Sequence, residues 1–262
     1  MSKNFMSWRL RVWQILLLLV LLFIWYVLSR DTGFAFFFGQ PIEVAKVIWQ
    51  WFFVDGDIYP HLGVTLSETL LAFVIGTVSG LAFGLWLGLS PSASALLDPY
   101  ITAANSMPRV ILAPIFGMWF GLGIWSKVAL AVTLVFFIVF FNVYQGVREV
   151  SKTLLDNARM LGANHKQLLR YVYIPSAMSW VFSSLHTSVG LAFVGAVVGE
   201  YLGSASGVGY LILQAEGTLD VNTVYAGIIV LTAAALVLDA MVSLVEKKLL
   251  SWRPQQGNAT QL

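Results

Sequence analysis

The sequence predicts an all-α integral membrane protein with about six transmembrane helices. Hydrophobic residues make up 58% of its 262 residues and charged residues only 11%, and the mean hydropathy is +0.81. Such a chain holds too few charges to cover a water-soluble globule of its size. Its apolar runs reach the roughly 20 residues that a helix needs to cross a bilayer. They lack the alternating pattern of barrel strands, so helices are the structure that satisfies their backbone in lipid.

Six apolar stretches qualify as transmembrane helices, at about 12–28, 65–89, 105–126, 128–147, 178–199 and 222–244. The first could imitate a signal peptide, but Ser29, Arg30 and Asp31 follow it in place of a small-residue cleavage site. We therefore expect a retained anchor helix at the start of a single transmembrane domain that covers residues 1–262. The expected core of this domain runs from about 61 to 250.

The distribution of the cations predicts the orientation in the membrane. If the N-terminus lies inside, eleven lysines and arginines fall in cytoplasmic segments and three in external segments, as the positive-inside rule requires. The eleven are Lys3, Arg9, Arg11, Arg148, Lys152, Arg159, Lys166, Arg170, Lys247, Lys248 and Arg253, and the three are Arg30, Lys46 and Lys127. Both termini are therefore expected in the cytoplasm.

The second predicted span carries a glycine at every fourth position, at Gly76, Gly80, Gly84 and Gly88. This spacing places the glycines along one helix face and lets another helix backbone approach closely. Because glycine brings no recognition chemistry, helix packing within the subunit is the expected role of this face.

Two prolines, Pro108 and Pro114, interrupt the third predicted span, and each is expected to kink or unwind the helix. Such breaks are tolerated where protein or a water-filled cavity takes up the freed carbonyls. Arg109 lies between them and has two open interpretations. It marks the cytoplasmic end of this helix and snorkels to the interface, or it faces a polar cavity. In such a cavity Arg109 attracts an anionic solute or pairs with Asp98 or Asp239.

Three further polar residues, Asn142, Glu200 and Asp239, lie near span ends or on otherwise apolar faces. For each of them a local contact between helices or an anchoring role at the interface is the more common function. Asn142 and Glu200 remain candidates for contact with a solute.

The longest polar stretch between two predicted spans is residues 148–175, and it is rich in helix formers around a break at Gly162. The pattern predicts helix, break, helix. Apolar residues fall on one helix face while Arg159 and the residues from 164 to 167 point to water, which predicts an amphipathic helix at the cytoplasmic surface. The apolar residues are Leu154, Leu155, Ala158 and Leu161, with Met160 beside them. Pro175 then begins the fifth span, where its missing N–H costs least.

This segment resembles the cytoplasmic signature of the permease subunits of bacterial ABC importers, which reads Glu-Ala-Ala, three residues, Gly, nine residues, Ile-x-Leu-Pro. The match runs through Asp156-Asn157-Ala158, Gly162 and Val172-Tyr173-Ile174-Pro175, with every spacing kept. Aspartate and asparagine replace the first two signature residues, which affects the detailed contacts at these positions and leaves the spacing intact. The alternative is a solvated basic loop, which requires neither the glycine at that spacing nor the apolar face.

The similarity extends over roughly residues 61–254 and is greatest to the nitrate, sulfonate and taurine branch of these permeases. Supporting segments lie at 108–114, 119–123, 199–203, 206–211 and 246–254. The branch also includes permeases for pyrimidine vitamin precursors. The resemblance therefore implies the type I permease fold and a small solute, either an anion such as a sulfonate or nitrate or a pyrimidine-type vitamin precursor.

In that family this loop forms coupling helices that dock in a groove of the ATPase subunit. The resemblance implies that the following residues couple this chain to an ATPase: Leu155, Asp156, Asn157, Ala158, Leu161, Gly162, Ala163, Ile174 and Pro175. It further implies a bacterial inner-membrane location and an external solute-binding protein as a partner. The candidates for the translocation pathway are Pro108, Arg109, Pro114, Asn142 and Glu200.

Missing motifs limit the chemistry of the chain itself. There is no cysteine and no P-loop, so a thiol nucleophile is excluded and ATP with its Mg²⁺ is expected on a separate ATPase, with no cofactor in this chain. The three histidines, His61, His165 and His186, are too scattered to predict a metal site.

Six kinked helices without charge-lined faces enclose no pore, which favours a homodimer about a two-fold axis. A non-catalytic transport subunit of an ATP-driven complex is the function predicted. The alternatives are a gradient-driven secondary transporter or channel, which requires paired ionisable residues in mid-span, and a membrane enzyme, for which no convergent catalytic groups are found.

Overall fold

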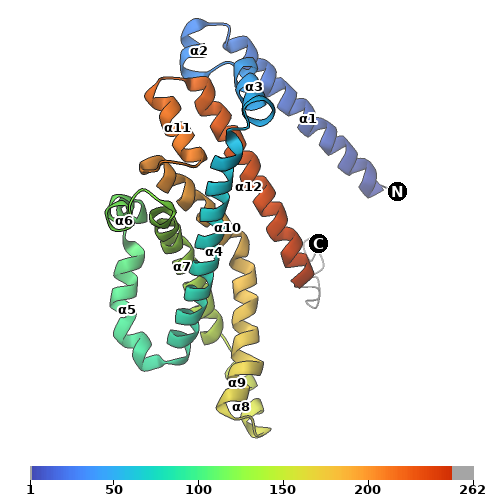
Figure 1. Cartoon of the computed structure of the whole chain (residues 1–262). Helices are drawn as coiled ribbons and strands as arrows, with labels where there is room; N and C mark the ends of the chain where they lie inside the picture. Colours follow the sequence, from blue (N-terminus) through green and yellow to red (C-terminus); the bar gives the residue numbers. More distant parts are fainter. Residues whose placement is uncertain (1, 250–262) are drawn as a thin grey trace.

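A computed structural model describes the backbone of residues 2–249 and the side chains of residues 10–176, 180, 184 and 186–244. All regular structure in this part of the chain is helical, which confirms the predicted all-α class (Figure 1). The helices are α1 (Ser2–Leu28), α2 (Thr32–Phe38), α3 (Pro41–Trp49), α4 (Ile58–Leu89), α5 (Pro91–Ser106), α6 (Ala113–Phe120), α7 (Ile124–Arg148), α8 (Lys152–Met160), α9 (His165–Leu168), α10 (Ile174–Leu202), α11 (Val208–Gly217) and α12 (Val221–Leu249). Three short segments of other helix types also occur. They are the π-helices η1 (Gln50–Val54) and η3 (Leu169–Tyr173) and the 3₁₀-helix η2 (Arg109–Leu112). The predicted segment 246–254 and several predicted cytoplasmic cations lie outside the described side chains.

Four helices within the described residues are long and apolar enough to cross a membrane. They comprise Leu10–Leu28, Ile58–Leu89, Ile124–Arg148 and Val221–Leu244. The predicted span at 178–199 falls within α10, which has 29 residues and so extends for about 43 Å at the usual helical rise. These five helices account for five of the six predicted spans.

The third predicted span, 105–126, is not one helix, and this prediction was wrong. The stretch contains the end of α5, then η2, α6 and a turn, with α7 starting at Ile124. Met107 is extended because the ring of Pro108 disfavours the helical conformation of the preceding residue. The second break is at Gly121, whose φ of +72° suits a residue without a Cβ. Pro114 kinks nothing, because it lies in the first turn of α6.

The centre of the molecule is formed by α4, α7 and α10, which pack on one another along most of their lengths (Figure 1). The glycine face of α4 lies against α7. A Cβ atom added at Gly76 would lie 2.7 Å from the Val135 side chain, and one added at Gly84 would lie 2.9 Å from the Phe140 carbonyl oxygen. A Cβ atom added at Gly80 or at Gly88 would also lie within 3 Å of α7. The two helices therefore pack too closely for a larger residue at these positions.

This close packing gives a stability prediction with a matched control on the same helix. Gly84→Ala should lower the melting temperature of the purified protein, because the new methyl group forces α4 and α7 apart at a typical cost of about 1–3 kcal/mol. Gly63→Ala, where nothing lies within 4 Å, should raise or preserve it, since alanine favours a helix over glycine by about 1 kcal/mol. Thermal unfolding in detergent measures both, and equal shifts would contradict the tight seam.

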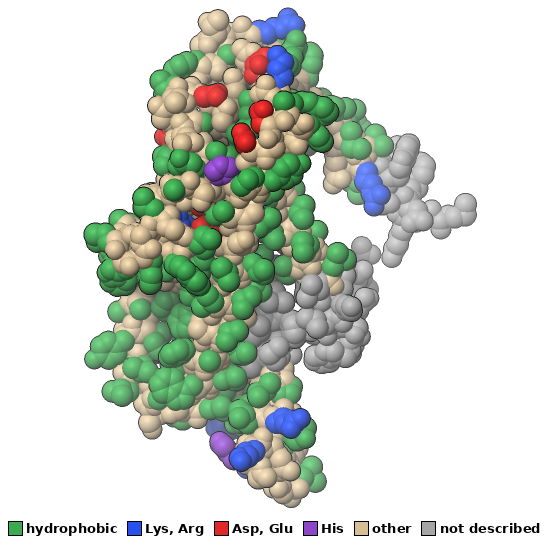
Figure 2. Space-filling view, in the orientation of Figure 1, with side chains coloured by type: hydrophobic (Ala, Val, Ile, Leu, Met, Phe, Trp, Pro, Cys, Tyr) green, Lys and Arg blue, Asp and Glu red, His purple; other side chains and the backbone are tan. Residues whose placement is uncertain are grey.

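The two ends of the helical core differ in charge. Acidic side chains gather, together with some basic ones, at the end that holds α2, α3 and α11, whereas the charged side chains seen on α8 and α9 at the opposite end are basic, and hydrophobic surface lies between (Figure 2). The described part of α1 extends away from the core, and its apolar segment, Leu10–Leu28, is not buried against the other helices. This arrangement is typical of a protein whose middle zone faces lipid.

Candidate functional site

The α8–α9 hairpin projects beyond the rest of the helical core (Figure 1). Its tip carries two apolar side chains, Met160 and Leu161, which are 85% and 89% exposed. Gly162 follows with a φ of +86° and with nothing within 4 Å of an added Cβ. Its N–H donates to the Arg159 carbonyl over 2.9 Å, which closes the end of α8. The hairpin therefore has the predicted helix, break, helix form and an uncovered apolar tip.

Local caps hold the hairpin in shape. The Ser151 hydroxyl accepts from the Leu154 N–H over 3.3 Å at the start of α8. At the start of α9, Asn164 and Gln167 form a reciprocal capping box with bonds of 2.9 and 2.8 Å. Because these contacts lie within the hairpin, its exposed apolar side chains, Leu154, Met160 and Leu161, are left to meet another surface.

The other predicted coupling residues lie in the same region. Asp156 and Asn157 are exposed on α8, and Asp156 pairs with Arg159 over 3.3 Å in a solvated contact of little energetic weight. Leu155, Ala158 and Ala163 are half-buried. Ile174 and Pro175 form the exposed first turn of α10, on the far side of η3.

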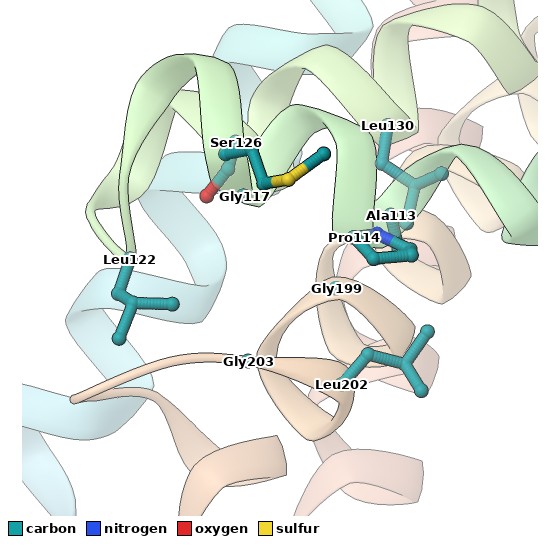
Figure 3. A pocket seen from close by; sticks show the side chains of 10 residues that line it. Ala113, Pro114, Gly117, Leu122, Ser126, Leu130, Gly199, Leu202 and Gly203 are labelled. Atoms are coloured by element: carbon teal, nitrogen blue, oxygen red, sulfur yellow. The ribbon is translucent and has the colours of Figure 1, made fainter.

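A pocket of about 280 Å³ opens between α6, α7 and the end of α10 (Figure 3). Its walls are largely apolar and rich in glycine, with the Ser126 hydroxyl as a polar group. The lining residues are Ala113, Pro114, Gly117, Met118, Leu122, Ser126, Leu130, Gly199, Leu202 and Gly203. Leu122 and Gly203 lie on the two loops at its rim. Of the five predicted pathway residues, this pocket includes Pro114.

Arg109 lies in η2 and faces the middle of α7. Its guanidinium is stacked over the Phe137 ring at 4.6 Å and donates to the Asn105 side chain over 2.5 Å. Phe137 is near the midpoint of α7, so Arg109 lies opposite the middle of that helix, a position that favours the cavity interpretation. No ion pair with Asp98 or Asp239 is found among the described residues.

The remaining candidates are separated from Arg109. The Asn142 amide donates to the Ile138 carbonyl of its own helix over 2.8 Å. Asp239 contacts His186 over 2.8 Å and so links α12 to α10. Pro108 precedes η2, and Glu200 is buried at the far end of α10. The structure thus does not gather the predicted pathway residues into one site.

A buried charge cluster was missed by the sequence interpretation. It consists of Glu68 from α4, Lys127 from α7 and Glu200 from α10, which are 1%, 1% and 0% exposed. Glu68 and Glu200 are hydrogen-bonded to each other, and the Lys127 ammonium lies near both, although no ion pair of Lys127 within 4 Å is found among the described residues. Glu68 interrupts an apolar run, and an ionisable residue inside a span is itself a signal of function. That signal was available in the sequence.

Glu200 and two residues of α4 cap the start of α11. The Gly209 N–H donates to the Glu200 carboxylate over 2.7 Å, the Val208 N–H to the Thr65 hydroxyl over 3.1 Å, and the Gly207 N–H to His61 Nδ1 over 3.0 Å. Thr65 donates in turn to Glu200 over 2.6 Å. A carboxylate at the N-terminus of a helix is favoured by the helix dipole.

The described residues contain no group of three acids or histidines suited to a metal ion.

The fold and these sites define a multi-span membrane protein with an exposed hairpin at one end and a pocket between its helices. Over residues 80–251 the chain matches the family described as "Binding-protein-dependent transport system inner membrane component". This match covers well over half of the sequence, and the protein belongs to that family.

Individual relatives agree with this assignment. The formylaminopyrimidine transport permease protein of Halalkalibacterium halodurans is 30% identical over 92% of this chain and 96% of that protein. The taurine transport system permease protein of Escherichia coli is 28% identical over 90% of this chain and 87% of that protein. An inward-facing structure of the MetNI methionine ABC transporter shares the fold, with a TM-score of 0.60, 18% identity, and coverage of 72% of this chain and 92% of that chain.

Proposed function

We propose that this chain is the non-catalytic permease subunit of an ATP-binding cassette importer, driven by an ATPase that docks on the α8–α9 hairpin. The observation that carries the proposal is the exposed apolar tip at Met160 and Leu161 beside the left-handed Gly162. An apolar surface that a rigid hairpin presents to solvent is typical of a docking site. ATP and Mg²⁺ bind to the separate ATPase in this scheme.

The proposed assembly contains two copies of this chain and an external solute-binding protein. In this proposal the hairpin and both termini face the cytoplasm, which the basic side chains on α8 and α9 support (Figure 2). The pocket between α6, α7 and α10 is open on one side, which suits a pathway completed by a second copy. The acidic end of the molecule then faces the binding protein.

The proposed solute is a small anion such as a sulfonate or nitrate, or a pyrimidine-type compound. Relatives whose names include taurine and formylaminopyrimidine support these two classes. Arg109 supports the anionic class, because its guanidinium lies opposite the midpoint of α7 and its buried Nε has no hydrogen-bond partner. A cation at this depth attracts negative charge strongly.

Purification of the tagged chain from its native membrane tests the proposal. We expect a P-loop ATPase and a solute-binding protein to co-purify, and we expect ATP hydrolysis by the complex to be inhibited by vanadate. A chain that purifies alone, with solute uptake independent of nucleotide, would contradict the proposal.

A gradient-driven transporter is the second candidate, and the buried Glu68–Glu200 pair is the observation that favours it. Paired carboxyl groups within spans serve as proton relays in such carriers. Vesicles that contain only this chain distinguish the two functions, since a carrier accumulates solute under an imposed proton gradient without an ATPase.

Arg109→Gln gives a specific test of the anionic solute. In cells with the complete system, the KM for taurine or an alkanesulfonate should rise about tenfold, which corresponds to the loss of one charge-assisted contact of about 1.4 kcal/mol. Uptake of an uncharged pyrimidine should not change. Arg148→Gln is the matched control, because Arg148 also stacks on an aromatic ring of α7, that of Tyr144, but does so at the end of this helix. Unchanged taurine kinetics in Arg109→Gln would assign Arg109 to helix packing.

A further inference from the structure

We propose that Glu68, Lys127 and Glu200 are positioning residues that fix the width of the pocket between α6, α7 and α10. They act through the two loops at the rim of the pocket and do not themselves line it. The inference rests on the proposed function in one respect, namely that this pocket belongs to the solute pathway.

Lys127 holds the first rim loop. Its ammonium group donates to the carbonyl oxygens of Leu122 and Gly123 over 2.5 and 3.1 Å. These carbonyls belong to the turn between α6 and α7, and the Leu122 side chain lies on the pocket wall (Figure 3). A charged donor on two backbone carbonyls is a stronger contact than a neutral one, so the position of this loop depends on Lys127.

Glu200 holds the second rim loop, which connects α10 to α11. Its carboxylate accepts from the Gly209 N–H over 2.7 Å, and a Cβ at Gly207 would overlap that carboxylate. The loop is thus folded directly around the charged group. Gly203, which lines the pocket, lies in the stretch between Glu200 and this anchor. The position of the second loop therefore depends on Glu200.

The two anchors are physically one unit. The stem of Lys127 packs on Gly199, where an added Cβ would lie 3.0 Å from the Lys127 Cγ, and Gly199 itself lines the pocket. The charge cluster therefore lies directly behind the pocket wall and joins α7 to α10 at that point. A change in the cluster should therefore alter the distance between the two rim loops.

The hydrogen bonds assign a charge to each member. Both oxygens of Glu200 accept, one from Thr65 and one from Gly209, so Glu200 is the carboxylate. The proposal assigns the proton of this carboxyl pair to Glu68, since burial disfavours two neighbouring carboxylates that are both ionised. The second Glu68 oxygen, Oε2, has no hydrogen-bond partner. With Lys127 protonated, the cluster carries no net charge, as burial requires.

This assignment makes distinct predictions for three substitutions. Glu68→Gln keeps a neutral group that can donate to Glu200, so the pocket should be preserved. Glu200→Gln and Lys127→Met each leave one buried charge without its counter-charge, which is strongly unfavourable. The double variant, Glu200→Gln with Lys127→Met, removes both charges together, and part of the original geometry should return.

The absence of cysteine from the chain permits a direct measurement of the pocket. Gly117→Cys places a thiol in the pocket wall, where an added Cβ meets nothing within 4 Å. The rate of labelling by a hydrophilic maleimide is measured on the assembled complex in membranes open to both faces. Asp55→Cys, on an exposed turn before α4, reports any general change in access.

We expect Glu200→Gln and Lys127→Met each to raise the labelling rate of Cys at 117 at least about fivefold, since the loss of a buried charge partner is worth more than 1 kcal/mol. Glu68→Gln should stay within about twofold, and the double variant should move back toward the parent rate. The rate at position 55 should not change in any variant. A merely structural role predicts equal changes at both positions.

Two results would overturn the inference, and they are distinguishable from failure of the proposed function. Equal labelling at position 117 in the parent, Glu200→Gln and Lys127→Met variants would show that the cluster does not position the pocket. An additive double variant would show that the charges act independently. If the thiol at 117 is not labelled in the parent complex either with or without ATP, the pocket is not part of a water-filled pathway and the premise itself fails.

Discussion

Replacing Leu161 by aspartate is expected to abolish ATP-driven uptake and to release the ATPase from the complex. Leu161 is 89% exposed in the isolated chain, so the substitution removes no internal packing. In the assembled complex the same side chain is expected to be buried, and a carboxylate placed there without a partner would be desolvated. Such a charge costs several kcal/mol, which corresponds to a loss of affinity of at least about a hundredfold.

Co-purification of the ATPase and solute uptake measure this effect, with membrane insertion as the reference. Leu219→Asp is the matched control, because Leu219 is also strongly exposed but lies at the opposite end of the molecule, in the turn before α12. It should leave ATPase binding intact. Normal ATPase recovery with Leu161→Asp would show that the hairpin tip is not the docking surface.

The hairpin could be predicted from the sequence because its structure is local. Helix formers, an apolar face and Gly162 lie within one short segment, and the caps at Ser151 and Asn164 use neighbours three residues away. Such contacts depend on spacing along the chain and hardly on the rest of the fold. Sequence patterns therefore carried most of the information needed for this element.

The third predicted span was wrong because its structure depends on contacts outside the segment. Residues 105–126 are apolar enough to span a membrane, but hydropathy does not indicate whether the backbone is continuous. Pro108 and Gly121 interrupt it at two points, so α6 has only eight residues. The prolines were recognised in the sequence, yet whether a proline kinks a helix, ends one or begins one depends on the neighbouring helices.

The buried charge cluster could not be assembled from the sequence alone. Glu68, Lys127 and Glu200 lie on three different helices, and they meet only because α4, α7 and α10 pack together. Lys127 and Glu200 each resemble an interfacial anchor at a span end, and Glu68 by itself does not indicate which residues it meets. The close approach of α4 and α7 depends in turn on the glycine face of α4. The glycine spacing was recognised in the sequence, but the charge cluster that this packing brings together was not.

Substitution of Gly162 by valine is the second change with a large expected effect, and it should reduce uptake at least about tenfold. Gly162 has a φ of +86° and open space around it, so valine would meet no clash but would strain the backbone. That strain amounts to about 1–3 kcal/mol for a side chain held in this region. A helix cap of the kind at Ser151 contributes only about 1 kcal/mol, so the hairpin should lose its defined shape.

Gly162→Asn separates backbone strain from loss of contact, because asparagine tolerates the left-handed conformation that valine avoids. Both substitutions add a side chain of similar size at the same point. Uptake and ATPase recovery should therefore remain near the parent level with asparagine and fall with valine, while insertion of both variants stays normal. If both variants lose uptake equally, the partner must contact position 162 directly, and the glycine would be required for space. If both retain uptake, the turn need not be rigid, and the coupling role of the hairpin would have to rest on Met160 and Leu161 alone.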